Sequence, residues 1–193
     1  MKLLKLDLGC GRVPQKGYLG IDNFYKSKNI IKSDVLKYLK KLPKNSCSHI
    51  YSRHYLEHVD KKQIFQILKE INRILIKNGK IVFIVPHFSN PYFFSDLTHK
   101  IFFGIHTFNY ICETSCLKRK VPKYIEIKNW HLLNVRVNFI SIINIKFLGI
   151  KLPTLATFLK VFVNSSNLFI EIYERYLCNF FSIYEIKFEI QKK

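Results

Sequence analysis

Two glycines and two acidic residues near the N-terminus have the spacing of a nucleotide-binding loop. The stretch "LDLGCGRVPQKGYLGID" (6–22) ends an apolar run at Gly9, turns through Gly11 and reaches Asp22. Glycines in such a turn let a ligand approach the backbone closely. A carboxylate such as that of Asp22 can accept hydrogen bonds from both hydroxyls of a ribose, and Asp34 could accept one from an adenine amino group. The spacing therefore predicts a site for a nucleoside-containing ligand.

Two common nucleotide sites are disfavoured. The dinucleotide fingerprint requires a third glycine three residues after the second, and Pro14 stands there. The chain also lacks the Gly-Lys-Ser/Thr triplet of a phosphate-binding P-loop. Neither a nicotinamide cofactor nor a nucleoside triphosphate is the predicted ligand.

Two groupings resemble metal sites only in part. His54 and His58 would share a helix face, but a metalloprotease site needs Glu directly after the first His, and Tyr55 follows. Cys112 and Cys116 with His131 offer three ligands without a second cysteine pair. We therefore predict no metal, and we expect these cysteines to be ordinary thiols.

Short strands alternate with helical segments along the first half of the chain. Val35–Leu42 and the periodic run after Asp60, which Gly79 is expected to stop, predict helices. Residues 87–131 are aromatic and irregular, and 155–181 should be partly helical. Strands are predicted at Lys2–Leu8, Tyr18–Ile21, Asn29–Lys32, Ser48–Ser52, Lys80–Val85, Val135–Ile140 and Tyr184–Ile190.

This order predicts an α/β fold with a Rossmann-like, mostly parallel seven-stranded sheet and an antiparallel strand near the C-terminus. We expect one domain over 1–193, with residues 1–86 forming the cofactor-binding half and 87–193 the substrate-covering loops and C-terminal strands. Ligands of such sheets bind beyond the carboxyl ends of the strands. That edge should carry Gly9–Arg12, Asp22, Asp34, Ser52–His54 and Pro86–His87.

The ordered motifs resemble class I S-adenosylmethionine-dependent methyltransferases, most closely the compact methyltransferase-11-like branch. They are "LDLGCG", "GID", "SDV", "IYSRHYLEHV", "LKEINRILIKNGKIVFIVP" and "PHFSNPYFFSDLTHKIFFGIHTFNY". The resemblance covers about residues 3–110 well and the rest weakly. It implies S-adenosylmethionine as the cofactor and S-adenosylhomocysteine as the product.

The same resemblance assigns the cofactor-binding residues. Near the methionine part it implies a loop of Asp7, Gly9, Cys10 and Gly11. Asp22 would hold the ribose, Asp34 and the backbone of Val35 would meet the adenine, and Ser52, Arg53 and His54 would line the other side. Two structural alternatives stay open, because the glycines could form a simple turn and Asp34 could serve only as a helix N-cap.

The stretch "SDLTHK" (95–100) offers the best candidates for chemistry on the acceptor. Methyl transfer is an in-line displacement that depends on positioning, and a base helps when the acceptor is a hydroxyl. His99 is our first candidate and His87 the second, with Asp96 beside them. Alternatively, Asp96 and His99 only brace the loop by hydrogen bonds.

Helices that such folds usually carry have no room in this chain. The first strand starts at Leu3, residues 12–21 leave space for a loop, and residues 23–33 for at most one helical turn. One sheet face should therefore have little helical cover. We expect Leu155–Phe181 to fold over part of this face, or the face to meet a partner or a membrane surface. A core-covering helix pair is the favoured reading of that segment, and an interfacial amphipathic segment is the alternative.

Composition limits the partners. The net charge is +19, from 32 Lys and Arg against 13 Asp and Glu, and it is spread along the chain rather than gathered in an arm. We expect a small-molecule or glycan acceptor, with nucleic acid as the alternative acceptor, peripheral membrane contact as a further possibility, and a non-catalytic binding module as the alternative function. Five cysteines without framework spacing, no signal sequence and no long apolar run favour a cytoplasmic protein with reduced thiols.

Overall fold

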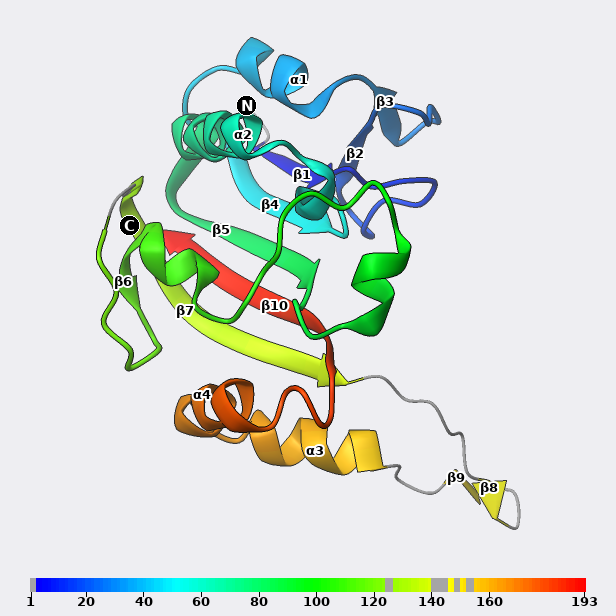
Figure 1. The fold of residues 1–193 in the computed structure, drawn as a ribbon. Coiled ribbons are helices and arrows are strands. Elements are labelled where there is room, and N and C mark those ends of the chain that lie inside the picture. The colour runs from blue at the N-terminus through cyan, green and yellow to red at the C-terminus, as the bar shows by residue number, and fades with distance from the viewer. Residues whose placement is uncertain (1–2, 124–126, 140–145, 148–149, 152–154) are drawn as a thin grey trace.

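An eight-stranded mixed sheet forms the centre of the protein, in a computed structural model that describes residues 3–123, 127–139, 146–147, 150–151 and 155–193 (Figure 1). The strand order is β3-β2-β1-β4-β5-β10-β7-β6. The strands are β1 (Leu4–Leu8), β2 (Leu19–Asp22), β3 (Ile30–Lys32), β4 (Cys47–Arg53), β5 (Leu75–Pro86), β6 (Cys112–Ser115), β7 (Ile127–Phe139) and β10 (Ile183–Lys192). A separate two-stranded ribbon joins β8 (Lys146–Phe147) to β9 (Ile150–Lys151).

The N-terminal half of the sheet is parallel, as the alternation of elements predicts. Strand β1 pairs in parallel with β2 and β4, β2 with β3, and β4 with β5. All five strands therefore end at the same edge. The loops that follow β1, β2, β4 and β5 meet there, which places the predicted crevice at this edge.

The C-terminal strand β10 lies between β5 and β7 and is antiparallel to both. This confirms the predicted antiparallel strand. The prediction of seven strands was one short, because Cys112–Ser115 adds β6 parallel to the outer edge of β7. Four residues within an irregular aromatic stretch carry too little periodicity to identify such an edge strand, and β7 itself starts earlier than expected, at Ile127.

Helices α1 (Val35–Lys41) and α2 (Lys61–Ile74) cover one face of the sheet (Figure 1). Helix α2 buries one apolar stripe formed by Ile64, Ile67, Leu68, Ile71 and Ile74. The expectation that Gly79 stops this helix was wrong. The helix ends at Ile74, and Leu75 already pairs with Cys47 as part of β5. Strand pairing therefore overrides the helical periodicity at this point.

The opposite face of the sheet is open and polar. Neighbouring strands place Lys5 beside His49 and His49 beside Lys80. Farther along, Lys187 lies beside Arg136. Between β1 and β2, and between β2 and β3, the described chain forms turns and bends without a helix. This confirms the prediction that one face of the sheet has little helical cover, because only short turns connect these strands.

Helices α3 (Leu155–Val163) and α4 (Asn167–Tyr176) lie along the outer edge, beside β7 (Figure 1). The contacts of α4 lie on the covered side: Glu174 bonds His87, and Tyr173 packs edge-on against Phe139. For α4, the expectation that Leu155–Phe181 folds over the open face was therefore wrong. Of the residues in α3, only Val163 is buried. No helix in the described part of the chain is long and apolar enough to span a membrane.

The side-chain amide of Asn164 forms hydrogen bonds with the edge of β7 beyond the part that pairs with β6. The Asn164 side chain accepts a hydrogen bond from the Val137 amide at 2.9 Å and donates to the Val137 carbonyl at 2.8 Å. It therefore satisfies both polar groups of this residue, as a neighbouring strand would. Because Val137 is fully buried, water cannot replace these bonds readily.

We predict that Asn164→Ala lowers the free energy of unfolding by about 2 kcal/mol, the usual cost of leaving buried backbone groups without partners. Urea unfolding followed by circular dichroism measures the change. Ser165→Ala is the matched control, because the exposed Ser165 hydroxyl bonds only the Phe162 carbonyl. An equal effect of both substitutions would contradict the role given to Asn164.

Candidate functional site

The glycine loop after β1 is held against the end of β2. Gly9 and Gly11 adopt left-handed backbone conformations, with φ of 65° and 60°. The Gly9 amide donates to the Ile21 carbonyl at 2.8 Å, and the Gly11 amide donates to Asp22 Oδ2 at 2.9 Å. The loop therefore needs both glycines for its conformation, and it brings Asp22 to its own backbone.

Asp22 is a buried carboxylate that organises the loops around it. Besides Gly11, it accepts hydrogen bonds from the amides of Phe24 at 2.8 Å and Tyr25 at 3.2 Å. Its side chain therefore has a fixed orientation at the end of β2. An oxygen that accepts one N–H retains a second lone pair, so the carboxylate can still accept from a ligand hydroxyl.

Asp7 lies one strand away and is also buried. Its Oδ2 accepts from the Gln15 amide at 2.7 Å, whereas Oδ1 has no partner among the described residues. Burial raises the pKa of Asp7 to about 6, and the Gln15 bond opposes this shift. Burial, with the charges of Asp7 and Asp22, raises the pKa of the neighbouring Cys10 thiol to about 11. Cys10 is therefore a neutral thiol at neutral pH rather than a nucleophile.

Asp34 stands directly before α1 and caps it. Its Oδ1 accepts from the Lys37 amide at 2.8 Å, so the structural alternative of an N-cap is confirmed. Val35 follows as the first residue of the helix and is buried in the core. Capping occupies one carboxylate oxygen of Asp34 and leaves the other for a ligand.

The three residues predicted to line the other side of the cofactor, Ser52, Arg53 and His54, lie in three different environments. Ser52 is buried and donates to the Leu8 carbonyl at 2.9 Å, which ties β4 to β1. Arg53 is half exposed and pairs with Glu185 at 3.2 Å. His54 has a left-handed backbone, with φ of 51°. Such a conformation costs free energy in a residue with a Cβ, so surrounding contacts must stabilise it.

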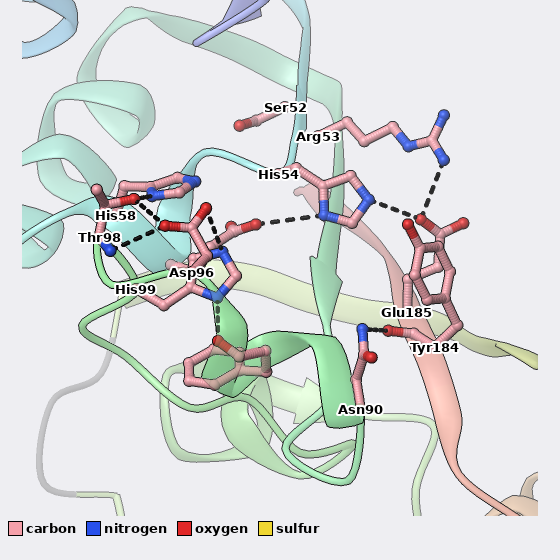
Figure 2. Close-up of polar contacts among 12 residues, drawn as sticks. Ser52, Arg53, His54, His58, Asn90, Asp96, Thr98, His99, Tyr184 and Glu185 are labelled. Carbon is pink, nitrogen blue, oxygen red and sulfur yellow. Dashed lines mark hydrogen bonds and ion pairs between the residues drawn. The ribbon is translucent and has the colours of Figure 1, made fainter. Parts of the chain in front are cut away.

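Those contacts come from two buried carboxylates. His54 Nε2 lies 3.0 Å from Glu185 Oε2 (Figure 2). On the other side of the ring, His54 Nδ1 lies 3.3 Å from Glu57 Oε1. Burial lowers the pKa of His54, but the bonds to Glu185 and Glu57 outweigh it and raise the pKa to about 9. Burial raises the pKa of Glu185, and the bonds from His54 and Asn138 with the Arg53 charge outweigh it and lower the pKa to about 2. At neutral pH His54 is therefore a cation paired with the Glu185 carboxylate.

The segment after His54 contacts both the glycine loop and the loop of residues 93–101, which carries Asp96 and His99 and is called the acceptor-side loop below. A Cβ added to Gly9 would lie 2.3 Å from the Tyr55 ring, so this ring covers the glycine closely. The Glu57 carbonyl accepts from the Lys100 amide at 2.7 Å. The 3-10 helix η1 (Leu56–His58) thus lies between the two predicted halves of the site. The sharing of one helix face by His54 and His58, weighed from the sequence, is wrong because His54 precedes η1.

His99 and Asp96 lie together in the acceptor-side loop (Figure 2). His99 Nδ1 is 2.9 Å from the Phe93 carbonyl, and His99 Nε2 is 3.6 Å from Asp96 Oδ2. Asp96 also accepts from the Thr98 hydroxyl at 2.6 Å, and chiefly this bond lowers the pKa of Asp96. His99 therefore sits in a fixed orientation and is only slightly exposed.

His87 has a different environment. It is fully buried, with Nδ1 2.8 Å from the Ser89 hydroxyl and Nε2 3.0 Å from Glu174 Oε2. Glu174 also accepts from the Ile105 amide at 2.6 Å. Both ring nitrogens are occupied, so the arrangement favours a bracing role for His87 between β5, α4 and the loop at Ile105.

Three residues of this region escaped the sequence reasoning. Tyr55 and Glu57 stood within the motif "HYLEH", but nothing in the spacing indicated that one covers Gly9 and the other is buried. Glu185 lies in a strand of alternating pattern, 131 positions after His54. The alternating polar positions of that strand gave no signal that singled out Glu185. The grouping of Cys112, Cys116 and His131 does not form a metal cluster among the described residues, and all five cysteines are unpaired.

Comparison with known proteins agrees with this architecture. A family model described as a methyltransferase domain matches residues 20–83, which include β2 to β4, α2 and most of β5. The solved structure of an S-adenosylmethionine-dependent methyltransferase from Archaeoglobus fulgidus matches 98% of this chain and 86% of its own, with a TM-score of 0.59 at 20% identity. The chain has the fold of class I methyltransferases, and residues 20–83 match a methyltransferase domain. S-adenosylmethionine is the cofactor that this domain match implies.

Two other methyltransferase structures share the fold. Geranyl diphosphate C-methyltransferase from Streptomyces coelicolor A3(2) matches the whole chain and 70% of its own, with a TM-score of 0.53 at 12% identity. A phosphoethanolamine N-methyltransferase 2 from Haemonchus contortus matches the whole chain at 13% identity with a TM-score of 0.51, but this chain spans only 49% of its length. No curated protein has a matching sequence. At these identities the likeness describes the methyltransferase fold and leaves the acceptor open.

We predict that Gly9→Ala destabilises the protein more than Gly11→Ala does. Both substitutions place a Cβ on a left-handed backbone, which costs about 1–2 kcal/mol. Only the Cβ at position 9 would also meet the Tyr55 ring, whereas that at position 11 meets no atom within 4 Å. Overpacking should add about 1–3 kcal/mol. Urea unfolding of both variants measures the difference, and equal losses would contradict the close packing of Tyr55 on Gly9.

Proposed function

We propose that this methyltransferase transfers the methyl group of S-adenosylmethionine to a hydroxyl of a small-molecule or glycan acceptor. One observation carries the proposal: the Tyr55–His58 segment contacts the glycine loop through Tyr55 and the 93–101 loop through Glu57. A cofactor held by the first loop would therefore present its methyl group toward the second. The position of the segment supports a reaction centre between the two loops.

The cofactor-side roles are part of this proposal. The loop of Gly9, Cys10 and Gly11 would hold the methionine part, and the free Oδ1 of Asp7 would accept from its ammonium group. Asp22 would accept from the ribose hydroxyls, and Asp34 with the Val35 backbone would contact the adenine. Ser52, Arg53 and His54 would act mainly by fixing the end of β4, since their side chains bond Leu8, Glu185 and Glu57.

His99 is the group we assign to the acceptor hydroxyl. Because a carbonyl oxygen can only accept, the contact with Phe93 makes Nδ1 the donor and leaves a lone pair on Nε2. That lone pair can accept the proton of a hydroxyl as its oxygen attacks the methyl carbon. Asp96, whose Oδ2 lies 3.6 Å from Nε2, would stabilise the imidazolium that forms, and His87 would brace the loop.

The surface around this loop favours a ring-shaped or apolar acceptor. Tyr92, Phe94 and Phe102 are 59%, 66% and 58% exposed, and the rings of Phe94 and Phe102 lie 5.9 Å apart. Exposed aromatic rings offer flat faces on which the apolar side of a sugar or an aromatic compound can pack. This supports a glycan or small-molecule acceptor.

A nucleic-acid acceptor is the alternative, and the open sheet face favours it. Lys5, Arg53, Lys80, Arg136 and Lys187 lie on that face, against Glu185 and Glu189. Basic surfaces bind phosphate backbones in a salt-sensitive way. Fluorescence anisotropy with a single-stranded RNA distinguishes a nucleic-acid acceptor from a small-molecule or glycan acceptor. A micromolar affinity for the RNA that falls steeply with salt would favour the nucleic acid.

Contact with an anionic membrane surface is a further part of the proposal. Exposed apolar side chains extend over α3 and α4, with Phe158, Phe162 and Phe169 stacked in sequence. Lys118 and Arg119 lie beside α4, because both of their amides bond Glu171. An apolar helix surface bordered by basic residues matches the requirements of an interfacial helix at acidic lipids. Of the two helices expected to cover the core, α4 therefore fits that role far better than α3 does.

For the cofactor site, we predict micromolar binding of S-adenosylmethionine and S-adenosylhomocysteine by isothermal titration calorimetry. Asp22→Ala should weaken binding about 10- to 100-fold, the effect of losing a charged hydrogen-bond acceptor. Asp60→Ala is the control, because Asp60 is exposed and bonds only Lys100. Asp22→Asn keeps an acceptor oxygen and serves if the alanine variant does not fold. Equal affinities of the Asp22 and Asp60 variants would refute the ribose role.

For the apolar surface, we predict co-sedimentation with vesicles that contain acidic phospholipid but not with neutral vesicles. Phe158→Ser together with Phe162→Ser should reduce the bound fraction severalfold, since each removes an exposed aromatic ring. Phe180→Ser, in an 80% exposed residue outside α3, is the control. Binding that is unchanged in the double variant would exclude α3 as the contact.

A further inference from the structure

Three metal-ligating side chains converge beside the proposed reaction centre. Glu57, His58 and His99 each place one potential ligand atom within 4.8 Å of the other two. They come from two separate segments, η1 and the 93–101 loop, and the rings of His58 and His99 lie 4.8 Å apart between centroids (Figure 2). Two imidazoles and a carboxylate are the ligand set that zinc and related first-row ions prefer.

Both imidazoles are held in the tautomer that a metal requires. His99 Nδ1 must donate to the Phe93 carbonyl, which cannot donate. His58 Nδ1 lies 2.8 Å from the Thr98 hydroxyl, whose proton goes to Asp96 Oδ1 at 2.6 Å. Thr98 therefore accepts from His58. In both rings the lone pair is on Nε2, and a hydrogen bond from Nδ1 to an oxygen is the usual support of a metal-bound histidine.

Glu57 supplies an independent observation. Its side chain is fully buried, and Oε2 has no hydrogen-bond partner among the described residues, although Oε1 lies 3.3 Å from His54. A buried carboxylate oxygen without a partner is costly, so a cation beside it would stabilise the protein. Asp96 Oδ2, 3.6 Å from His99 Nε2, adds a second negative group at the same place.

We propose that Glu57, His58 and His99 bind one divalent first-row transition-metal ion through Glu57 Oε2 and the two Nε2 atoms. Three protein ligands leave a coordination position for water or for an oxygen of the acceptor. This proposal departs from the prediction from the sequence that the chain has no metal site. The pairing of His54 with His58 suggested there was the wrong one, because His54 bonds Glu185 instead.

The site deepens the proposed function, on which its catalytic consequence rests. With an ion bound, His99 is a ligand rather than the base. Coordination lowers the pKa of the acceptor hydroxyl, whose proton passes to solvent. The resulting oxygen anion attacks the methyl carbon, the carbon–sulfur bond breaks, and sulfur keeps the electron pair as S-adenosylhomocysteine leaves.

Metal binding is tested without cofactor or acceptor, so its failure and the failure of methyl transfer are distinguishable. Tag-free full-length protein, cleared of metal with a chelator, is titrated with Zn²⁺ by calorimetry and with Co²⁺ by visible absorption. We expect one ion per chain, the ligand-field bands of a nitrogen- and oxygen-coordinated Co²⁺, and a rise in the unfolding temperature that EDTA reverses.

Variants assign the ligands. His58→Ala and His99→Ala should each weaken binding about tenfold or more and abolish the Co²⁺ bands. His131→Ala is the matched control, because His131 of β7 bonds Thr114 of β6 and lies outside the cluster. If His99→Ala does not fold, the His58→Ala variant decides alone. Absence of one-site binding, or equal weakening in the His131 variant, would overturn the proposal.

Discussion

The buried pairing of His54 with Glu57 and Glu185 is the interaction on which the arrangement of the site depends. Two carboxylates that are almost without exposure need a cation, and the His54 ring lies within 3.3 Å of both. This pairing fixes the end of β4 to the C-terminal strand and compensates for the left-handed backbone of His54. Because the chain reverses there, Tyr55 reaches Gly9 and Glu57 faces the acceptor-side loop.

Strand β10 makes this pairing possible. It inserts antiparallel between β5 and β7 and so brings Glu185 next to the carboxyl ends of the parallel strands. A residue near the C-terminal end of the sequence thus supports the short segment after His54. The candidate metal ligands then follow from the same reversal, since η1 places Glu57 and His58 toward His99.

The short connections between the first strands leave one face of the sheet exposed. Where short loops replace the helices between the first strands, one sheet face carries charged side chains, with Glu185 and Glu189 partly balancing the lysines and arginines. The other face packs against almost the entire hydrophobic core. There Phe83 stacks on Phe108, and Phe188 packs edge-on against Phe108. Stability therefore comes from one side of the sheet, and the opposite side is available for binding.

The sequence by itself determined the glycine loop, the parallel strands around it, the missing helices and the presence of Asp22 and Asp34 at strand ends. These features are local: apolar runs, glycine at left-handed positions and loop lengths depend on near neighbours. The sequence also identified the segment of Asp96 and His99. Only the tertiary structure decided the role of Glu57, the packing of Tyr55 on Gly9, the end of α2 at Ile74 and the edge strand β6. Each of these depends on contacts between distant segments, and such contacts leave no periodic signal in the chain.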